Sequence, residues 1–164
     1  MGEESSPALH WDAALPQDSL QLDAQLCFRL YAASRLITRL YQPLLEPLGL
    51  TYPQYIVLMI LWQDAPCPVS HIGGRALLNT NTLTPLLKRL EQQGYVRRQR
   101  SHEDERVVEI HLTEAGSALR ARCACVPATL AATTHFPLEK AESLITLLDE
   151  LLAGLREQAG PKAQ

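Results

Sequence analysis

Apolar side chains recur at three- and four-residue steps over two stretches of the N-terminal half, a spacing typical of amphipathic helices. The first stretch begins near Leu20 and is ended or kinked by Pro43 and Pro47. The second is YIVLMILWQD, which follows a capping residue, Thr51, and an early proline, Pro53. The apolar positions of the first stretch are Leu22, Leu26, Leu30, Ala33, Ile37, Leu40 and Leu44.

Two further helices are predicted, and the second has a strongly polar beginning. VSHIGGRALL predicts a short helix, and NTNTLTPLLKRLEQQGY places its leucines on one face of a helix that Gly94 ends. Pro85 is tolerated only within the first turn, where backbone N–H groups have no partner inside the helix. The helix should therefore begin between Thr80 and Thr82, with threonine and asparagine side chains crowded at its N-terminus.

The pattern changes from helical to alternating after Gly94. The runs YVRRQR and VVEIHLT flank the polar turn SHEDE, which predicts a β-hairpin. Helical spacing returns from Glu114 to about Thr134 and from Leu138 to Glu157. The last helix carries an apolar stripe of Leu144, Leu148, Leu151, Leu152 and Leu155. We therefore predict a mainly α fold of about six helices with a small β-wing.

Length and composition fit one domain with short tails. A chain of 164 residues, 46% of them hydrophobic, is long enough to bury one core. We predict a mobile acidic tail over residues 1–19, a single domain over 20–158 and a C-terminal tail over 159–164. No stretch approaches the roughly 20 apolar residues of a membrane span, and the N-terminus lacks the basic start of a signal peptide. We therefore expect a cytoplasmic protein with no membrane partner.

Basic residues are concentrated in one part of this acidic chain. The net charge is −3, whereas arginine and lysine cluster between Arg75 and Arg106. The cluster coincides with a helix, a short helix, a polar-capped helix and a hairpin, the order of a winged helix-turn-helix. In that arrangement the capped helix enters the major groove of double-stranded DNA and the hairpin reaches along the duplex.

The DNA-binding candidates are polar and basic side chains of the capped helix and the hairpin. Threonine and asparagine can donate to phosphates or base edges, and lysine and arginine neutralise phosphate charge. The candidates are Thr80, Asn81, Thr82, Thr84, Lys88, Arg89, Arg97, Arg98, Arg100 and Arg106. A solvated basic surface is the alternative, and it is less favoured because these arginines directly follow a polar-capped helix. Arg106 could instead pair with Asp104 to shape the wing.

The four cysteines are expected to be free thiols, because the cytoplasm keeps thiols reduced. Cys123 and Cys125 form a C-x-C pair without a second pair or a histidine cluster, so we expect no metal site and no cofactor. Cys67 lies in a loop and has no assigned role. Cys27, in AQLCFRLY, lies on the apolar face of the first helix, where periodicity alone favours a buried, inert residue.

Several segments resemble a known family. SHEDERVVEIHLTEAG and TLTPLLKRLEQQGYVRR resemble the wing and the recognition helix of the MarR family of winged-helix regulators. QLCFRLY, LTYPQYIVLMILW and TLTPLLKRLE are together similar to its organic-hydroperoxide-sensing (OhrR) branch. The resemblance covers roughly residues 20–122. It implies a homodimeric repressor in which residues 50–113 bind DNA and the helices within 20–48 and 114–158 dimerise.

The resemblance also implies a role for Cys27, as the thiol that organic hydroperoxides oxidise. The tyrosines that hydrogen-bond this sulfur in the family match Tyr41 and Tyr52, and Phe28 and Tyr31 are candidates for the pocket wall. Fourteen residues of helix place Tyr41 on nearly the same face as Cys27 but about 21 Å further along the axis. We therefore expect both tyrosines to reach Cys27 from the partner subunit.

The sequence departs from the family at the resolving thiol. In two-cysteine members the second cysteine falls near Ala132 when the sequences are aligned on Val126-Pro127, and Ala132 has no sulfur. Cys123 and Cys125 lie two to three helical turns earlier, and either could resolve oxidised Cys27 or simply fill a helix interface. A low-molecular-weight thiol is the competing partner.

We therefore predict a redox-sensing transcriptional regulator, and not an enzyme. It would bind operator DNA as a homodimer and release it when Cys27 is oxidised by an organic hydroperoxide. Two alternatives remain open. One is a MarR-type repressor released by a phenolic or drug-like ligand without thiol chemistry, and the other is a thiol peroxidase, which would consume peroxide steadily and bind no operator.

Overall fold

The computed structural model describes residues 20–102 and 104–159. The predicted acidic tail over 1–19 and most of the predicted C-terminal tail lie outside the described residues. The chain divides into two compact units between Arg39 and Leu40, a boundary that falls inside the first long helix.

The first unit contains the beginning of that helix. A short 3-10 turn, η2 (Leu22–Ala24), precedes α1 (Leu26–Leu45), so the helix starts six residues later than the periodicity suggested. Gln25 separates the two in an extended conformation, which ends the hydrogen bonding of the turn. Pro43 lies inside α1 near its C-terminal end, and the chain then continues through a second 3-10 turn, η3 (Glu46–Leu48).

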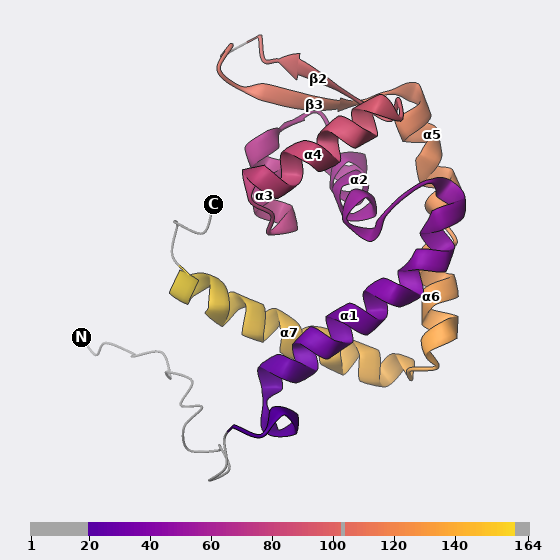
Figure 1. Ribbon diagram of the computed structural model, residues 1–164, viewed down its shortest axis with the longest axis vertical. Coiled ribbons are helices and arrows are strands. Elements are labelled where there is room, and N and C mark those ends of the chain that lie inside the picture. Colours follow the sequence, from indigo (N-terminus) through magenta and orange to yellow (C-terminus); the bar gives the residue numbers. More distant parts are fainter. Residues whose placement is uncertain (1–19, 103, 160–164) are drawn as a thin grey trace, which may run out of the picture. The chain divides into compact units, whose positions relative to one another are not determined.

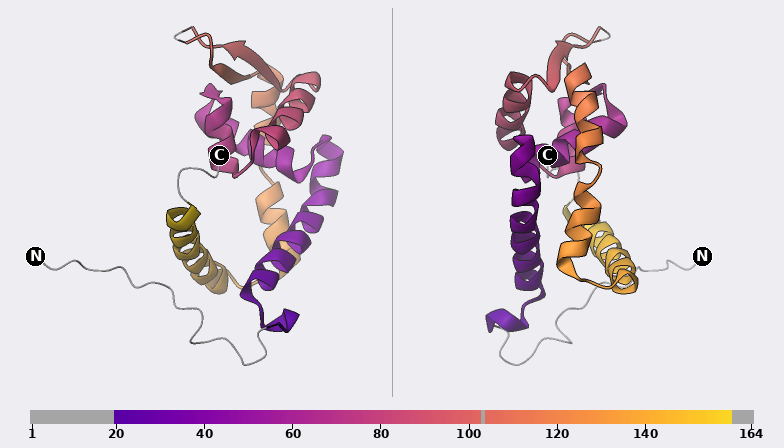
Figure 2. Two further views of the ribbon diagram at one scale, coloured as in Figure 1. Left: turned by 60° about the vertical axis from the view of Figure 1, so that its left-hand side comes forward. Right: turned by 90° about the vertical axis from the view of Figure 1, so that its right-hand side faces the viewer.

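The second unit contains a winged helix-turn-helix. Its elements are α2 (Tyr52–Asp64), β1 (Cys67–Pro68), α3 (Val69–Ala76), α4 (Thr80–Gln92), β2 (Val96–Arg100) and β3 (Val108–Leu112). The predicted hairpin is confirmed as β2 and β3, and Figure 1 shows it above α4. Sequence analysis missed β1, a two-residue strand that pairs Cys67 with Ile110 and gives the order β1-β3-β2. The strands β2 and β3 project beyond the helices of this unit in both views of Figure 2.

Local sequence explains where these helices begin. The Thr51 side chain and Gln54 form a capping box at the start of α2, with Pro53 in its first turn, as the sequence suggested. At α4 the Asn79 side chain accepts a hydrogen bond from the Thr82 backbone N–H at 2.9 Å. This cap places the start of α4 at Thr80, which confirms the predicted beginning.

The region predicted as one helix over 114–134 is interrupted by a turn. It forms α5 (Glu114–Cys123) and α6 (Val126–Thr134), followed by α7 (Leu138–Ala159). Pro127 lies in the first turn of α6, and because proline has no N–H it cannot continue hydrogen bonding from α5. The fold class is otherwise as predicted, mainly helical with a small antiparallel sheet.

The core of the second unit lies between α2, α3, α4, α5 and the sheet. Its most buried side chains are large aliphatic residues that come from every one of these elements. They are Leu45, Val57, Leu58, Leu61, Ile72, Leu83, Leu87, Leu90, Val96, Ile110 and Leu119. One face of α4 is therefore fixed to the protein, and its other face is exposed.

Candidate DNA interface and thiol site

The exposed face of α4 is polar at its start and basic further on. Thr80, Asn81, Thr82 and Thr84 are all exposed, whereas Leu83 is buried between them. Lys88 and Arg89 are exposed as well. The helix N-terminus adds a partial positive charge to the end that bears the threonines. α4 thus presents hydrogen-bond donors and positive charge on a helix whose opposite face is anchored in the core.

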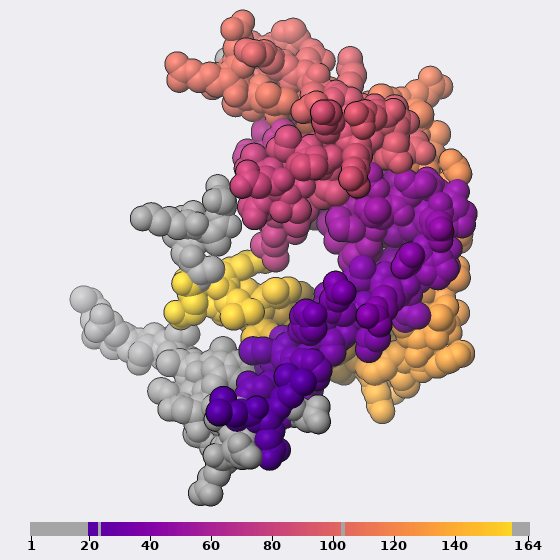
Figure 3. Space-filling view, in the orientation of Figure 1, coloured from indigo at the N-terminus to yellow at the C-terminus, as the bar shows by residue number. Residues whose placement is uncertain are grey.

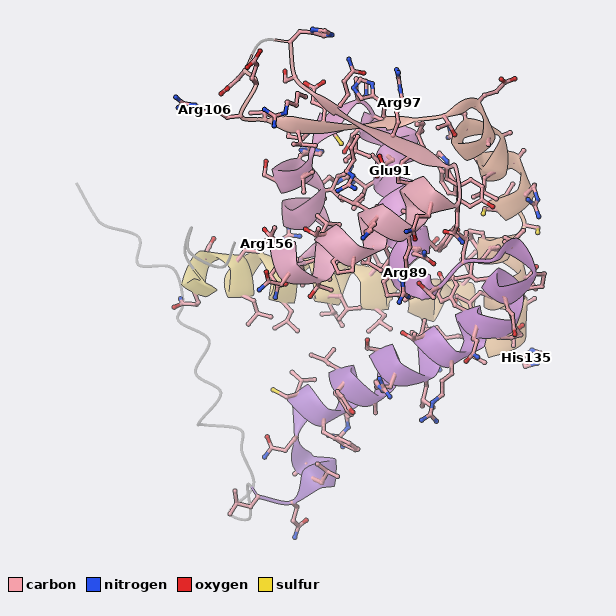
Figure 4. All side chains as sticks on the ribbon, turned by 45° about the horizontal axis from the view of Figure 1, so that its top comes forward. Arg89, Glu91, Arg97, Arg106, His135 and Arg156 are labelled. Carbon is pink, nitrogen blue, oxygen red and sulfur yellow. The ribbon has the colours of Figure 1, made fainter. Side chains whose placement is uncertain are left out.

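The hairpin continues this basic surface. Arg97, Arg100 and Arg106 are exposed, and Figure 4 shows Arg97 and Arg106 on the hairpin with Arg89 on α4. A recess of about 460 Å³ separates the two elements and is lined in part by Thr80, Thr84 and Arg106. Figure 3 shows the surfaces of α4 and of the hairpin next to each other on one face. Thr80, Thr84, Arg98 and Arg106 therefore line one recess between α4 and the hairpin. Arg97 directly precedes Arg98 in β2, so its side chain projects from the opposite face of the strand.

Arg98 differs from the other predicted DNA contacts because it is paired within the protein. Its Nε donates to Glu91 Oε2 at 2.9 Å, and its Nη2 lies 2.8 Å from the same oxygen. The Arg98 backbone N–H donates to Glu91 Oε1 at 3.0 Å. These hydrogen bonds from Arg98 lower the pKa of Glu91. The pair joins the end of α4 to β2, so it connects the recognition helix to the wing.

Asp104 and Arg106 meet through the backbone of Arg106. The Arg106 N–H donates to Asp104 Oδ1 at 2.9 Å, and the Val107 N–H donates to the Asp104 carbonyl at 2.9 Å. The Asp104 carboxylate therefore shapes the turn of the hairpin by accepting from the main chain. The Arg106 side chain is exposed beside the recess described above.

In the first unit, Cys27 is exposed near the beginning of α1. Phe28 and Tyr31, the candidate wall residues, lie with their ring centroids 6.4 Å apart. Phe28 is half-buried, whereas Tyr31 is 61% exposed. Within this unit Cys27 thus lies beside aromatic side chains without the burial that periodicity alone suggested.

In the second unit, Tyr41 and Tyr52 stack on each other. Their ring centroids are 4.4 Å apart with an interplanar angle of 27°, so two tyrosines that the resemblance singled out do come together. Burial raises the pKa of both phenols, and the neighbouring Tyr52 raises that of Tyr41 further. Both hydroxyls therefore stay protonated at neutral pH and are available as hydrogen-bond donors.

Two aromatic residues beside this pair were missed. The Tyr55 ring lies 5.9 Å from Tyr41 and 6.2 Å from Trp62. Tyr55 is almost fully buried, and burial, with Tyr41 as a second cause, raises its pKa. The spacing Tyr52-Tyr55 is three residues, which places both on one face of a helix, so helical periodicity could have found Tyr55.

The remaining cysteines differ in accessibility. Cys67 and Cys123 are buried, and burial raises the pKa of both thiols, which makes them poor nucleophiles. Cys125, at the turn between α5 and α6, is exposed. Ala132, the position that matches the family's resolving cysteine, is exposed on α6. Cys125 is therefore the more accessible of the two candidate resolving thiols.

The described residues contain no grouped metal ligands and no single membrane-spanning helix. Within 20–102 and 104–159, no three His, Cys, Asp or Glu side chains are grouped so that they could hold a metal ion. In the same part of the chain no single helix is long and apolar enough to cross a membrane. Only a bent pair, Leu26–Leu48 with Tyr52–Asp64, has the necessary length and composition.

Known proteins share both the sequence and the fold. The chain is 44% identical over 143 residues to the HTH-type transcriptional regulator TtmR of Methylorubrum extorquens, covering 87% of this chain and 73% of TtmR. It is 43% identical over 141 residues to the organic hydroperoxide resistance transcriptional regulator of Bacillus subtilis, covering 86% and 96%. A solved structure of reduced AbfR bound to DNA matches with a TM-score of 0.69 and 36% identity, covering 85% and 97%.

AbfR has also been solved overoxidized and bound to DNA, and that structure matches with a TM-score of 0.68 and 37% identity, covering 85% and 98%. The family model described as transcriptional regulator SarA/Rot matches residues 39–122. This match spans the end of α1, the winged helix-turn-helix and most of α5. The chain belongs to the SarA/Rot-type, MarR-like family of winged-helix transcriptional regulators.

Proposed function

We propose that this regulator is a homodimeric, cytoplasmic repressor that leaves its operator when an organic hydroperoxide oxidises Cys27. The stacked, protonated pair Tyr41 and Tyr52 is the observation that carries the proposal, since two half-buried phenol donors suit a thiolate acceptor. The Bacillus subtilis relative is named as an organic hydroperoxide resistance regulator, and AbfR has been studied in reduced and overoxidized DNA-bound forms. Both relatives support a redox role.

We propose a dimer because the Cys27 thiolate needs hydrogen-bond donors, and Tyr41 on the same helix is too far away to be one of them. Tyr41 lies fourteen residues further along α1, which corresponds to about 21 Å of helix. Exposed apolar side chains on α1, and separately on α7, offer surfaces for a second copy of the chain. They include Leu26, Leu36 and Ile37 on α1 and Leu144, Leu152 and Leu155 on α7.

The sensing step is a displacement at the peroxide bond. The Cys27 thiolate attacks the hydroxyl oxygen of the hydroperoxide, the O–O bond breaks, and the leaving alkoxide takes a proton from solvent to become an alcohol. The sulfur becomes a sulfenic acid, which condenses with a second thiol to give a disulfide and water. Cys125 is the accessible candidate in the chain, and a low-molecular-weight thiol is the external one.

DNA binding would use the surface formed by α4 and the hairpin. Thr80, Asn81, Thr82 and Thr84 would contact base edges or phosphates in the major groove, while Lys88 and Arg89 neutralise phosphates. Arg97, Arg100 and Arg106 would contact the backbone from the wing. A homodimer would place two such surfaces about one turn of DNA apart, and oxidation would change their spacing.

A gel shift with Cys27→Ser tests the proposal. The unaltered dimer should lose at least about tenfold in operator affinity after one equivalent of cumene hydroperoxide, whereas Cys27→Ser should bind equally before and after treatment. Cys125→Ser is the matched control, and it should still respond if an external thiol is the resolving partner. Mass spectrometry of the treated dimer identifies the modified cysteine.

Normal release of Cys27→Ser by the hydroperoxide would refute the proposed mechanism. Release of the reduced protein by a phenolic ligand, without any change in thiol mass, would instead favour the ligand-sensing alternative. Steady consumption of peroxide by a protein that binds no operator would favour a thiol peroxidase.

A further inference from the structure

A row of aromatic rings in the second unit runs from Tyr41, near the end of α1, along α2. Tyr52 stacks on Tyr41 at 4.4 Å, Tyr41 lies 5.9 Å from Tyr55, and Tyr55 meets Trp62 edge-on at 6.2 Å. Tyr55 is only 3% exposed, and the other three rings pack against the same core. The row begins at the candidate sensor tyrosines and ends at the far end of α2.

Trp62 connects this row to α5. Its indole Nε1–H donates to the Gly116 carbonyl oxygen at 2.9 Å, a bond between residues 54 positions apart in the sequence. The indole has one donor and no acceptor, and here its donor is directed at the first turn of another helix. A displacement of the ring is therefore a displacement relative to the beginning of α5.

The beginning of α5 is in turn fixed to the end of the recognition helix. A Cβ added at Gly116 would clash with the Tyr95 carbonyl oxygen, so the two backbones are in close contact. Thr113 Oγ1 donates to the Gly94 carbonyl at 2.6 Å and accepts from the Gly116 N–H at 3.0 Å. Gly94 and Tyr95 are the residues that lead from α4 into β2.

Trp62 also borders open space. A recess of about 240 Å³ lies beside it and is lined in part by Tyr55, Met59, Arg120 and Cys123. Close-packed interiors resist gradual deformation, and coupling requires an element with two discrete arrangements. The recess leaves open space beside the Trp62 side chain, which a second arrangement of that side chain would need.

We propose that Trp62 is a positioning residue that couples the Tyr41–Tyr52 pair to the junction between the recognition helix and the wing. The inference rests on the proposed function, because it assigns the route by which oxidation of Cys27 reaches DNA. Oxidation of Cys27 removes the thiolate that accepts hydrogen bonds from Tyr41 and Tyr52, and Tyr55 and Trp62 then shift. The hydrogen bond from Trp62 to Gly116 transmits this shift to Gly94 and Tyr95.

Trp62→Phe tests this coupling because it keeps an aromatic ring and removes the N–H donor. We expect its operator affinity in the reduced state to stay within about twofold of the unaltered protein. After one equivalent of cumene hydroperoxide, the loss of operator affinity in Trp62→Phe should be smaller than the loss in the unaltered protein by about fivefold or more. Met59→Leu, which lines the same recess without a hydrogen bond to α5, is the matched control and should respond normally.

A second measurement leaves Trp62 in place. The chain has two tryptophans, so a Trp11→Phe background makes Trp62 the single reporter of indole fluorescence. Emission should change when Cys27 is oxidised and should not change in the same background with Cys27→Ser. A purely structural role for Trp62 predicts constant emission in both proteins.

Mass spectrometry of Cys27 separates the two failures. If Cys27 is oxidised in the unaltered protein and the operator stays bound, the proposed function fails and the coupling fails with it. If the unaltered protein releases DNA and Trp62→Phe releases it equally, with Cys27 oxidised to the same extent, only the coupling is overturned. Constant Trp62 emission during a normal release would overturn the coupling in the same way, even if Trp62→Phe does not fold.

Discussion

The winged part of the chain and its last helix differ in where their leucines lie. In α4 every third or fourth position is an aliphatic side chain that is buried in the same chain, such as Leu83, Leu87 and Leu90. In α7 the same periodicity leaves Leu144 and Leu155 about half exposed. Burial of apolar area stabilises a fold by about 25 cal/mol per Å². The winged part buries its leucines within its own chain, whereas α7 would bury its leucines against a second copy of the chain.

Leu87→Ala should give the largest effect, because it removes a side chain from the internal core of the winged part. Leu87 is 1% exposed. Replacing a leucine buried to this extent by alanine lowers the free energy of unfolding by about 2–5 kcal/mol. Urea denaturation followed by circular dichroism measures the change. A cost below about 1 kcal/mol would contradict the claim that the winged part depends on its own core.

Leu144→Asp tests the other side of the comparison. A charge in the apolar stripe of α7 should weaken dimerisation by at least about tenfold, since a buried charge without a partner is costly at an interface. Analytical ultracentrifugation over a range of protein concentrations measures this. Thr146→Asp, an exposed position on a different face of the same helix, adds the same charge and should leave the dimer unchanged. Equal effects of the two variants would mean that the stripe is not the interface.

The same contrast explains how much of the fold could be predicted from the sequence. The beginning of α4 followed from Pro85, because the effect of proline on a helix is local and acts within one turn. The strand β1 did not follow, since two residues carry no periodicity and Cys67 pairs with Ile110 from a distant part of the chain. The break between α5 and α6 had a local signal in Pro127, but the apolar spacing on either side masked it.

The candidate site was predictable to a similar degree. Helix rotation gave the separation of Cys27 and Tyr41, and the resemblance singled out Tyr41 and Tyr52 as hydrogen-bond donors to Cys27. The stacking of these two tyrosines on each other was not predicted. The pairing of Glu91 with Arg98 was missed because both residues are plausible surface charges. Their contact forms because β2 turns back toward α4. The spacing of residues along the sequence does not reveal that turn.

Glu91→Gln should give the smallest effect. It tests whether the ion pair with Glu91 prevents Arg98 from contacting DNA. Removing the carboxylate releases the Arg98 guanidinium toward phosphate, and each added phosphate contact steepens the slope of log affinity against log salt by about 0.9. Fluorescence anisotropy with operator DNA between 50 and 200 mM salt, roughly the range in which such slopes are clear, measures it. Glu105→Gln, an exposed glutamate in the hairpin turn, removes the same charge without freeing an arginine and should leave the slope unchanged.

The contribution of the Glu91–Arg98 pair to stability should decrease as the pH falls. The pKa of Glu91 is lowered in the folded protein, so its contribution is present above the ordinary glutamate pKa of about 4.3 and is lost as the pH falls through the lowered value. The pair is partly exposed, so the contribution at neutral pH should be at most about 1 kcal/mol. The stability difference between the unaltered protein and Glu91→Gln should therefore shrink in acid. A difference that grows as the pH falls below 4.3 would show that Glu91 acts through something other than its charge on Arg98.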